Sequence, residues 1–241
     1  MPNIIAIDLD GTLLDRDKNI SQRNKKAIVK ALDAGYQIYL CSGRPAVFVS
    51  KIKSLLDQRL NIIAFNGAYY ENETEIKTYP LRNEDLIKLD ALISEDTPCF
   101  FKTLDTVYFT QEDKRFFYKG MTKKQINNVE DLKFYEILKV VILMQNHHAQ
   151  TLREFVQVYE YGNFGMELSC KEVDKTLHFQ QNNYYAIGDG VNDLPLFKNA
   201  AYSFAMNNSD ERLFEYADVI VENNTYEGVA KAIEIILNLP H

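Results

Sequence analysis

The stretch that decides the fold lies near the start of the chain, where residues 5–12 read IAIDLDGT. Its apolar, isoleucine-rich first part predicts a strand buried on both faces, which is typical of a parallel sheet. The run ends in Asp8 and Asp10, two like charges one residue apart. Buried strands do not normally end in two like charges. The two aspartates therefore require a positively charged partner.

Strand and helix patterns alternate in the residues that follow. After the strand expected at residues 3–7, a helix capped by Ser21 is expected, then a strand at 37–41. Pro45 suits the first turn of a second helix, and residues 61–65 form a third apolar run. This order predicts a parallel α/β sheet.

The middle of the chain has a different pattern, rich in aromatic residues and candidate strands, as an α+β insert would have. Residues 71–78 are polar and predict a hairpin or a hinge. Helices are expected at residues 83–93 and 148–159, and strands at 100–102, 107–110, 139–144 and 165–169. The α/β alternation returns with a strand at residues 184–187. We therefore expect a core formed by residues 1–80 and 172–241, with a mixed α+β domain at 81–171 inserted between them.

The composition narrows the class of protein. The chain has 241 residues, 46% of them hydrophobic, and a net charge of −7. An acidic chain without a basic stripe argues against a nucleic-acid partner, and no apolar run approaches the roughly 18 residues of a membrane span. The start has no signal-peptide pattern. Three cysteines without C-x-x-C spacing predict reduced thiols, and hence a cytoplasmic location.

Acidic residues follow a second strand in the later part of the chain, at Asp189 and Asp193. The carboxyl ends of parallel strands share one edge of the sheet, so these residues should join Asp8 and Asp10 there. For any one aspartate, turn formation is an equally good explanation. Four together stay ionised only with a counter-cation, and an all-oxygen ligand set favours Mg²⁺.

Such a site suits phosphoryl transfer. A carboxylate can attack phosphorus and form an aspartyl phosphate, while a second carboxylate moves protons to the leaving group and from water. Ser42 and the backbone N–H groups of the glycine turn at Gly43 can hold phosphate oxygens. A lysine is needed to offset the repulsion between the nucleophile and the phosphate.

At this point the sequence resembles the haloacid-dehalogenase-like hydrolase superfamily. Residues 8–14 (DLDGTLL), 41–45 (CSGRP) and 188–193 (GDGVND) resemble its first, second and fourth motifs. Three further segments resemble sequence motifs of the Cof-type subfamily, at residues 66–68 (NGA), 205–208 (AMNN) and 227–230 (EGVA). The resemblance implies a Rossmann-like core with an inserted α+β cap. It also implies a Mg²⁺-dependent phosphatase of small metabolites, chiefly sugar phosphates.

The resemblance also implies a role for each matching residue. Asp8 is the nucleophile and a metal ligand, and Asp10 is the general acid/base whose backbone carbonyl also faces the metal. The further metal ligands are Asp189 and Asp193, and the phosphate-binding residues are Ser42, Gly43, Lys175, Asn66 and Asn192.

The third motif departs from the family pattern. Lys175 is our choice for its lysine, but Thr176 stands where glycine is usual, and only thirteen residues separate Lys175 from Asp189. The helix expected between them must shrink to little more than a turn. Lys171 is an alternative, and a surface role for Lys175 is another. A catalytically weak metabolite-binding protein, or a phosphotransferase or phosphomutase on the same scaffold, therefore remain alternative functions.

Several other side chains have two interpretations in the sequence. Arg44 can steer an anionic substrate or pair with a carboxylate. The aromatic residues Phe116, Phe117 and Tyr118 can belong to the cap core or face the substrate. The oligomeric state is left open.

Overall fold

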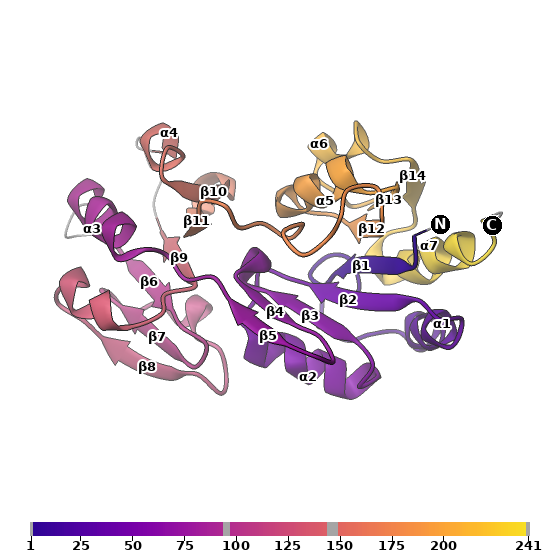
Figure 1. The fold of residues 1–241 in the computed structure, drawn as a ribbon, viewed down its shortest axis with the longest axis horizontal. Helices are drawn as coiled ribbons and strands as arrows, with labels where there is room; N and C mark the ends of the chain where they lie inside the picture. Colours follow the sequence, from indigo (N-terminus) through magenta and orange to yellow (C-terminus); the bar gives the residue numbers. More distant parts are fainter. Residues whose placement is uncertain (1, 94–96, 144–148, 240–241) are drawn as a thin grey trace.

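The structure is a computed structural model that describes residues 2–93, 97–143 and 149–239. Two β-sheets lie side by side, and the chain passes between them twice (Figure 1). We call the larger sheet with its helices the core, and the smaller sheet with its helices the cap. In the described part of the chain, no helix is both long enough and apolar enough to cross a membrane.

The core sheet contains six parallel strands and an antiparallel hairpin at one edge. In spatial order its strands are β14 (Val219–Val221), β13 (Tyr202–Met206), β12 (Tyr185–Gly188), β1 (Ile4–Asp8), β2 (Gln37–Cys41), β3 (Asn61–Ala64), β4 (Tyr69–Glu71) and β5 (Ile76–Thr78).

Helices cover both faces of this sheet because the side chains of β1 alternate. Ile5 and Ile7 pack under α1 (Gln22–Asp33), α2 (Ala46–Leu56) and α7 (Gly228–Ile236). Ala6 faces the opposite side, which α5 (Leu194–Asn199) and α6 (Glu211–Phe214) cover. The expected cap of the first helix is confirmed, because the Ser21 side chain accepts a hydrogen bond from the Asn24 backbone N–H. Pro45 was expected in the first turn of the second helix and lies one position earlier, at the N-cap of α2. This burial on both faces makes β1 a rigid support for the residues at its end.

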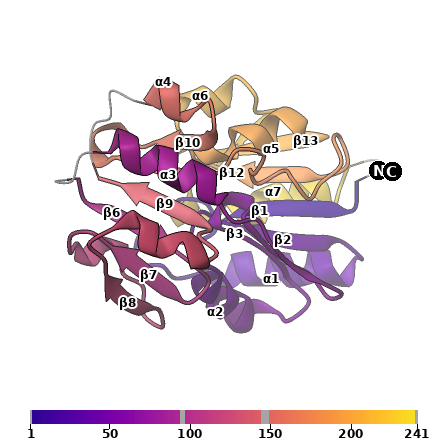
Figure 2. The same cartoon turned by 60° about the vertical axis from the view of Figure 1, so that its left-hand side comes forward.

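The cap sheet has six strands, of which only β7 and β8 pair in parallel. In spatial order they are β10 (Val156–Glu160), β11 (Met166–Cys170), β9 (Lys139–Ile142), β6 (Cys99–Lys102), β7 (Thr106–Phe109) and β8 (Thr122–Gln125). The helices α3 (Asn83–Leu92) and α4 (Ala149–Leu152) pack on one face, and α3 lies across the sheet in Figure 2. Val47 of α2 packs against the other face, which is therefore turned toward the core.

Short 3-10 turns complete the chain. They are η1 (Phe65–Gly67), η2 (Lys114–Phe116), η3 (Val129–Phe134), η4 (Gly162–Phe164), η5 (Val191–Asp193) and η6 (Asn224–Tyr226). Two of them, η1 and η5, follow strands of the core and lie at the candidate site.

The fold class is confirmed, a Rossmann-like parallel-sheet core with an inserted α+β cap. Residues 71–78 contribute to a hairpin of β4 and β5, the first of the two alternatives. The helix expected at residues 148–159 is wrong, because only α4 is helical and β10 follows it. Val156 and Val158 are buried with period two, so tertiary pairing with β11 outweighs local helical preference. Residues 144 and 148, at the ends of two expected elements, lie outside the described residues.

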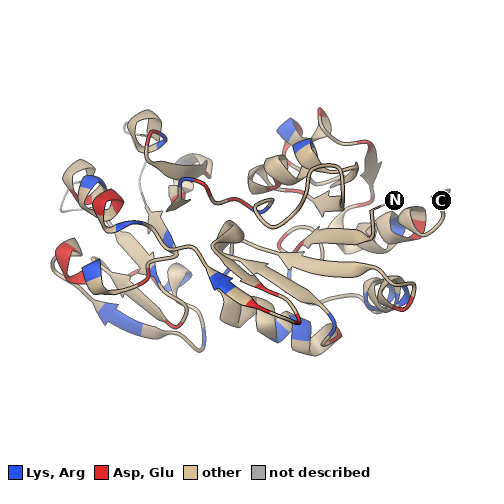
Figure 3. Ribbon diagram, in the orientation of Figure 1, with Lys and Arg blue, Asp and Glu red and all other residues tan. Residues whose placement is uncertain are grey.

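Besides β10, a second strand of the cap, β8, was missed from the sequence. All four residues of β8 are exposed, so it lacks the apolar alternation by which strands are recognised. In Figure 3, the lysines of β8 appear in blue at the outer edge of the cap. The domain limits at residues 80 and 171 stay a prediction.

The short connection after Lys175 is built from turns, with Phe179 N–H donating to the Thr176 carbonyl at 2.8 Å. The connection is thus as short as the sequence predicted, and aromatic rings cover the sheet at this place. The His178 ring stacks on Tyr70 with centroids 4.1 Å apart, and Phe179 packs edge-on against Tyr39 at 5.1 Å. This packing fixes the connection, and with it the position of Lys175, without a helix of several turns.

Candidate active site

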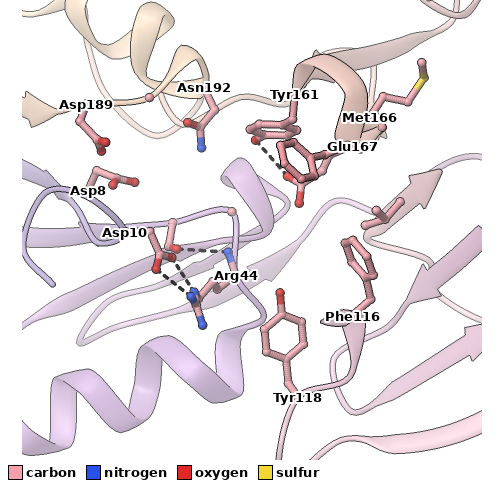
Figure 4. Close-up of a pocket in the computed structure, with 16 residues that line it drawn as sticks. Asp8, Asp10, Arg44, Phe116, Tyr118, Tyr161, Met166, Glu167, Asp189 and Asn192 are labelled. Atoms are coloured by element: carbon pink, nitrogen blue, oxygen red, sulfur yellow. Dashed lines mark hydrogen bonds and ion pairs between the residues drawn. The ribbon is translucent and has the colours of Figure 1, made fainter. Parts of the chain in front are cut away.

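Three carboxylates meet where β1 and β12 end. Asp8 is the last residue of β1, Asp189 follows β12, and Asp193 closes η5. One oxygen from each lies within 4.8 Å of the others. Figure 4 shows Asp8 and Asp189 facing each other at one end of the pocket. The structure thus brings together three of the four aspartates singled out in the sequence.

Lys175 is the positive group of this cluster. Its side chain is fully buried, and its Nζ donates to Asp8 Oδ1 at 2.7 Å and to Asp193 Oδ1 at 2.6 Å. Burial alone would lower the pKa of Lys175, but the two carboxylates outweigh it and raise this pKa above its usual range. Lys175 is therefore a buried cation, and the surface alternative is excluded by its position.

One lysine does not balance three carboxylates. Burial, followed by the charge of Asp193, raises the pKa of Asp8 well above its usual value. The same two causes raise the pKa of Asp189 to about 7. These shifts indicate negative charge without sufficient compensation. The surplus and the all-oxygen donor set fit a hard divalent cation held by Asp8, Asp189 and Asp193.

Backbone and side-chain donors fix the two later aspartates. Asp193 Oδ2 accepts from the backbone N–H groups of Asp189 and Gly190 at 3.1 and 3.0 Å. The Thr12 hydroxyl donates to Asp189 Oδ1 at 2.8 Å, and Asn208 Nδ2 approaches Asp189 Oδ2 at 3.4 Å. Thr12 and Asn208 lie inside the quoted motifs, but nothing in the sequence alone assigned them this role.

A glycine is required beside the cluster. Gly11 has a φ of +83°, and a Cβ there would lie 2.1 Å from Asp189 Oδ2. Only glycine adopts this backbone conformation readily and leaves space for the carboxylate. The Asp-Gly-Thr turn therefore bends the chain so that Thr12 reaches Asp189.

Asp10 has a different environment from the other three aspartates. Arg44 donates two hydrogen bonds to it, Nε to Oδ2 at 2.5 Å and Nη2 to Oδ1 at 2.7 Å (Figure 4). Lys18 Nζ also donates to Asp10 Oδ1, at 2.8 Å. Burial raises the pKa of Asp10, but these partners outweigh it and hold this pKa below its usual value. Of the two interpretations of Arg44, the carboxylate pair is the one observed. Lys18 was missed because it lies in a polar turn without a motif.

The candidate phosphate-binding residues gather around the turn after β2. Ser42 and Gly43 line the pocket together with Asn192. Asn66 has a left-handed backbone with φ of 56°, is buried, and accepts from Asn192 Nδ2 at 2.9 Å. Asn66 thus holds the Asn192 amide in place. Its direct contact with phosphate stays a prediction, as do the roles of the other three.

A cavity of about 370 Å³ separates these core residues from the cap. Its cap wall contains Phe116 and Tyr118, whereas Phe117 packs edge-on against Phe100 and Phe109. The aromatic segment therefore divides between the two interpretations left open in the sequence, two rings facing the cavity and one joining the cap core.

The cap also contributes charged residues that the sequence analysis missed. Lys139 Nζ donates to Glu167 Oε2 at 2.6 Å and to the Gly43 carbonyl at 2.5 Å. Burial raises the pKa of Glu167, but Lys139 outweighs it and lowers this pKa overall. Glu167 Oε2 also accepts from Asn66 Nδ2 at 3.1 Å and so ties the cap to the core. The sequence did contain a signal for these two residues, because each is the one charged residue of an otherwise uncharged cap strand.

The sequence profile of the haloacid dehalogenase-like hydrolases matches residues 5–233, and the chain belongs to this family. A Bacillus subtilis relative, 5-amino-6-(5-phospho-D-ribitylamino)uracil phosphatase YcsE, is 28% identical over 95% of this chain and 94% of its own. Phosphoglycolate phosphatase of Methanobrevibacter smithii is 27% identical over 95% of this chain and 96% of its own. Among solved structures, the HAD subclass IIB sugar phosphatase BT4131 superposes with a TM-score of 0.82 at 19% identity, covering 97% and 98% of the two chains.

These comparisons confirm the predicted superfamily and its Cof-type branch. They also confirm the predicted enzyme class, a phosphoric monoester hydrolase of the haloacid-dehalogenase-like type. The family is typically metal-dependent, which agrees with the surplus negative charge of the aspartate cluster.

Proposed function

We propose that this enzyme is a Mg²⁺-dependent phosphatase of small phosphorylated metabolites that works through an aspartyl phosphate on Asp8. The observation that carries the proposal is the buried cluster of Asp8, Lys175, Asp189 and Asp193 at the end of the cavity. This cluster places a nucleophilic carboxylate beside one fixed cation and a site suited to a second one.

In the proposed reaction, the phosphate ester lies with its oxygens toward the Ser42 hydroxyl, the Gly43 turn and the Asn192 amide. Lys175 holds one oxygen of Asp8, and the carboxylate attacks phosphorus while the bond to the leaving alkoxide breaks. Mg²⁺ bound at the three carboxylates would neutralise phosphate charge. Water then hydrolyses the aspartyl phosphate and restores Asp8.

Asp10 is proposed to move the protons. It gives a proton to the leaving alkoxide and takes one from the attacking water. In the structure it is paired with Arg44 and Lys18, which favours its ionised form. Asp10 must therefore release Arg44 before it can act as an acid. A substrate phosphate has the charge to draw the guanidinium away.

The cavity volume of about 370 Å³ supports a small substrate. The names of the relatives support phosphorylated metabolites as the class, and we propose sugar phosphates as its first members to test. The short connection leaves Lys175 within 2.7 Å of Asp8, which removes the main argument for a catalytically weak binding protein. The three cysteines are free, in agreement with the cytoplasmic location that we propose.

The test is phosphate release from p-nitrophenyl phosphate and a panel of sugar phosphates, with Mg²⁺ and with EDTA. Asp8→Asn should lose at least about a thousandfold in kcat, because the amide cannot act as nucleophile. Asp131→Asn, at an exposed position of the cap, is the matched control and should keep full activity. Equal rates in the Asp8→Asn variant and the parent enzyme would refute the proposal. Transfer to a sugar in place of free phosphate would favour a phosphotransferase or mutase.

A further inference from the structure

Two lysines lie next to each other on the face of the cap sheet that is turned toward the core. Lys102 at the end of β6 pairs in register with Lys139 at the start of β9, and both are 1% exposed. Side-chain alternation places Phe100, Val141 and Glu167 on the same face. Val141 and Glu167 line the cavity, and the two lysines lie next to them on this face without lining the cavity themselves.

The two lysines differ in their partners. Lys139 is satisfied by Glu167 and by the Gly43 carbonyl. In the described part of the chain, the Lys102 ammonium contacts aromatic rings, with Nζ 4.6 Å from the Tyr118 centroid and 5.6 Å from that of Phe116. The charge of Glu167 acts on it without an ion pair. Within the described ranges, no carboxylate forms an ion pair with Lys102. A buried ammonium of this kind is costly, and ring contacts offset only part of the cost.

The two other cations beside the cap side of the cavity have carboxylate partners. Asp10 balances Arg44, and Glu167 balances Lys139, so among the described residues there Lys102 is the cation without an ion pair. Burial, followed by the charge of Lys139, lowers the pKa of Lys102 to about 7. An arriving anion would remove this penalty and return the lysine to its charged form.

The two rings that contact Lys102 line the cavity, whereas Lys102 itself does not, so its ammonium lies directly behind these rings. The Lys139 contact with Gly43 places the lysine pair close to the turn proposed to bind phosphate. We propose that Lys102, supported by Lys139, is a second anion-binding subsite, which takes a carboxylate or a second phosphate on the leaving group of the substrate. This inference rests on the proposed phosphatase function and gives it a specificity for acidic phosphomonoesters.

The test uses three two-carbon phosphomonoesters that differ only in the second group: 2-hydroxyethyl phosphate, phosphoglycolate and 1,2-ethanediol bisphosphate. The parent enzyme should prefer an acidic member over the hydroxyl member in kcat/KM. The preferred acid identifies the anion as carboxylate or phosphate. A parent enzyme without such a preference would overturn the proposal.

Lys102→Met keeps the apolar stem and removes the charge, so the preference should fall by about tenfold or more, mainly through KM. Its rate on 2-hydroxyethyl phosphate should change little. Lys102→Gln is a second variant in case the first does not fold. Lys124→Met, on the exposed strand β8, is the matched control and should keep the preference. An equal loss on all three esters, or no loss, would overturn the proposal.

A binding measurement separates this proposal from the phosphatase proposal. With EDTA present, calorimetry of the parent enzyme and Lys102→Met should show tighter binding of the acidic esters that depends on Lys102. If no ester is hydrolysed under any condition, the phosphatase proposal fails, and this binding difference still decides the subsite. Equal affinities of both proteins for the acidic esters would refute it.

Discussion

The two walls of the cavity have uncompensated charges of opposite sign. The core wall buries more carboxylates than one lysine can balance, and the cap wall buries one more ammonium than its carboxylate can balance. The surplus carboxylates of the core wall do not pair with the Lys102 ammonium of the cap wall, because they lie on different sides of the cavity. The difference supports the two proposals made above, a magnesium ion at the core wall and an acidic substrate at the cap wall.

The largest effect is expected for Lys175, the buried lysine of the core wall. Lys175→Met leaves Asp8 and Asp193 unpaired, and we expect the free energy of unfolding to fall by about 3–5 kcal/mol. Activity should be lost with it, and added Mg²⁺ should recover part of the stability. Denaturant unfolding with and without Mg²⁺ measures both effects.

The control for this change is Lys171→Met, which removes the alternative motif lysine. Lys171 donates a hydrogen bond to the Arg153 carbonyl near the surface, and its loss should cost less than about 1 kcal/mol. A Lys175→Met protein as stable as Lys171→Met would show that the core cluster does not need its lysine.

The second prediction follows from the raised pKa values of Asp8 and Asp189 in the metal-free protein. Between the ordinary carboxyl pKa near 4 and the folded pKa of Asp189 of about 7, the folded state binds more protons than the unfolded state. The metal-free protein should therefore lose stability as pH rises through this window, and the loss that is due to Asp189 should end above it. Melting temperatures in EDTA at about pH 5 and about pH 8 test this sign.

Added Mg²⁺ should act in the opposite way. It binds the ionised carboxylates, so it should raise the melting temperature more at about pH 8 than at about pH 5. Asp189→Asn removes one of the groups and should weaken both the pH dependence and the effect of Mg²⁺. A pH profile identical in the parent protein and in Asp189→Asn would contradict the account of the core wall.

The two walls also differ in how far the sequence could predict them. Asp8 and Asp189 stand at strand ends, and a parallel sheet must bring such ends to one edge, so their meeting followed from the pattern of strands. Lys102 ends β6 and Lys139 begins β9, and two further strands, β7 and β8, lie between them in the chain. Their adjacency depends on the register between β6 and β9, which local sequence does not specify.

The same limit explains the errors in the cap. The expected helix at residues 148–159 and the missed β8 both lie where pairing with a neighbouring strand outweighs local preference. In the core, local and tertiary preferences agree, and the main exception is the connection after Lys175. There the rings of His178 and Phe179 replace a helix, a substitution that only the packed structure reveals.

The smallest expected effect is the change in stability caused by Lys102→Met. It is also the sharpest test of the difference between the two walls. Replacing an unpaired buried ammonium by an apolar side chain of similar length should leave the stability unchanged or raise it by about 1 kcal/mol. Because the folded pKa of Lys102 is about 7, below that of an unfolded lysine, the penalty is full below pH 7. It fades as pH rises toward the ordinary lysine pKa.

The gain from Lys102→Met should therefore be larger at about pH 6 than at about pH 9, whereas Lys124→Met should show no such dependence. The cap wall would then regain stability with rising pH, and the metal-free core wall would lose it. If Lys102→Met were instead strongly destabilising at every pH, the ammonium would have a structural partner. The cap wall would then be complete without an anion, since a satisfied lysine needs no charge from the substrate.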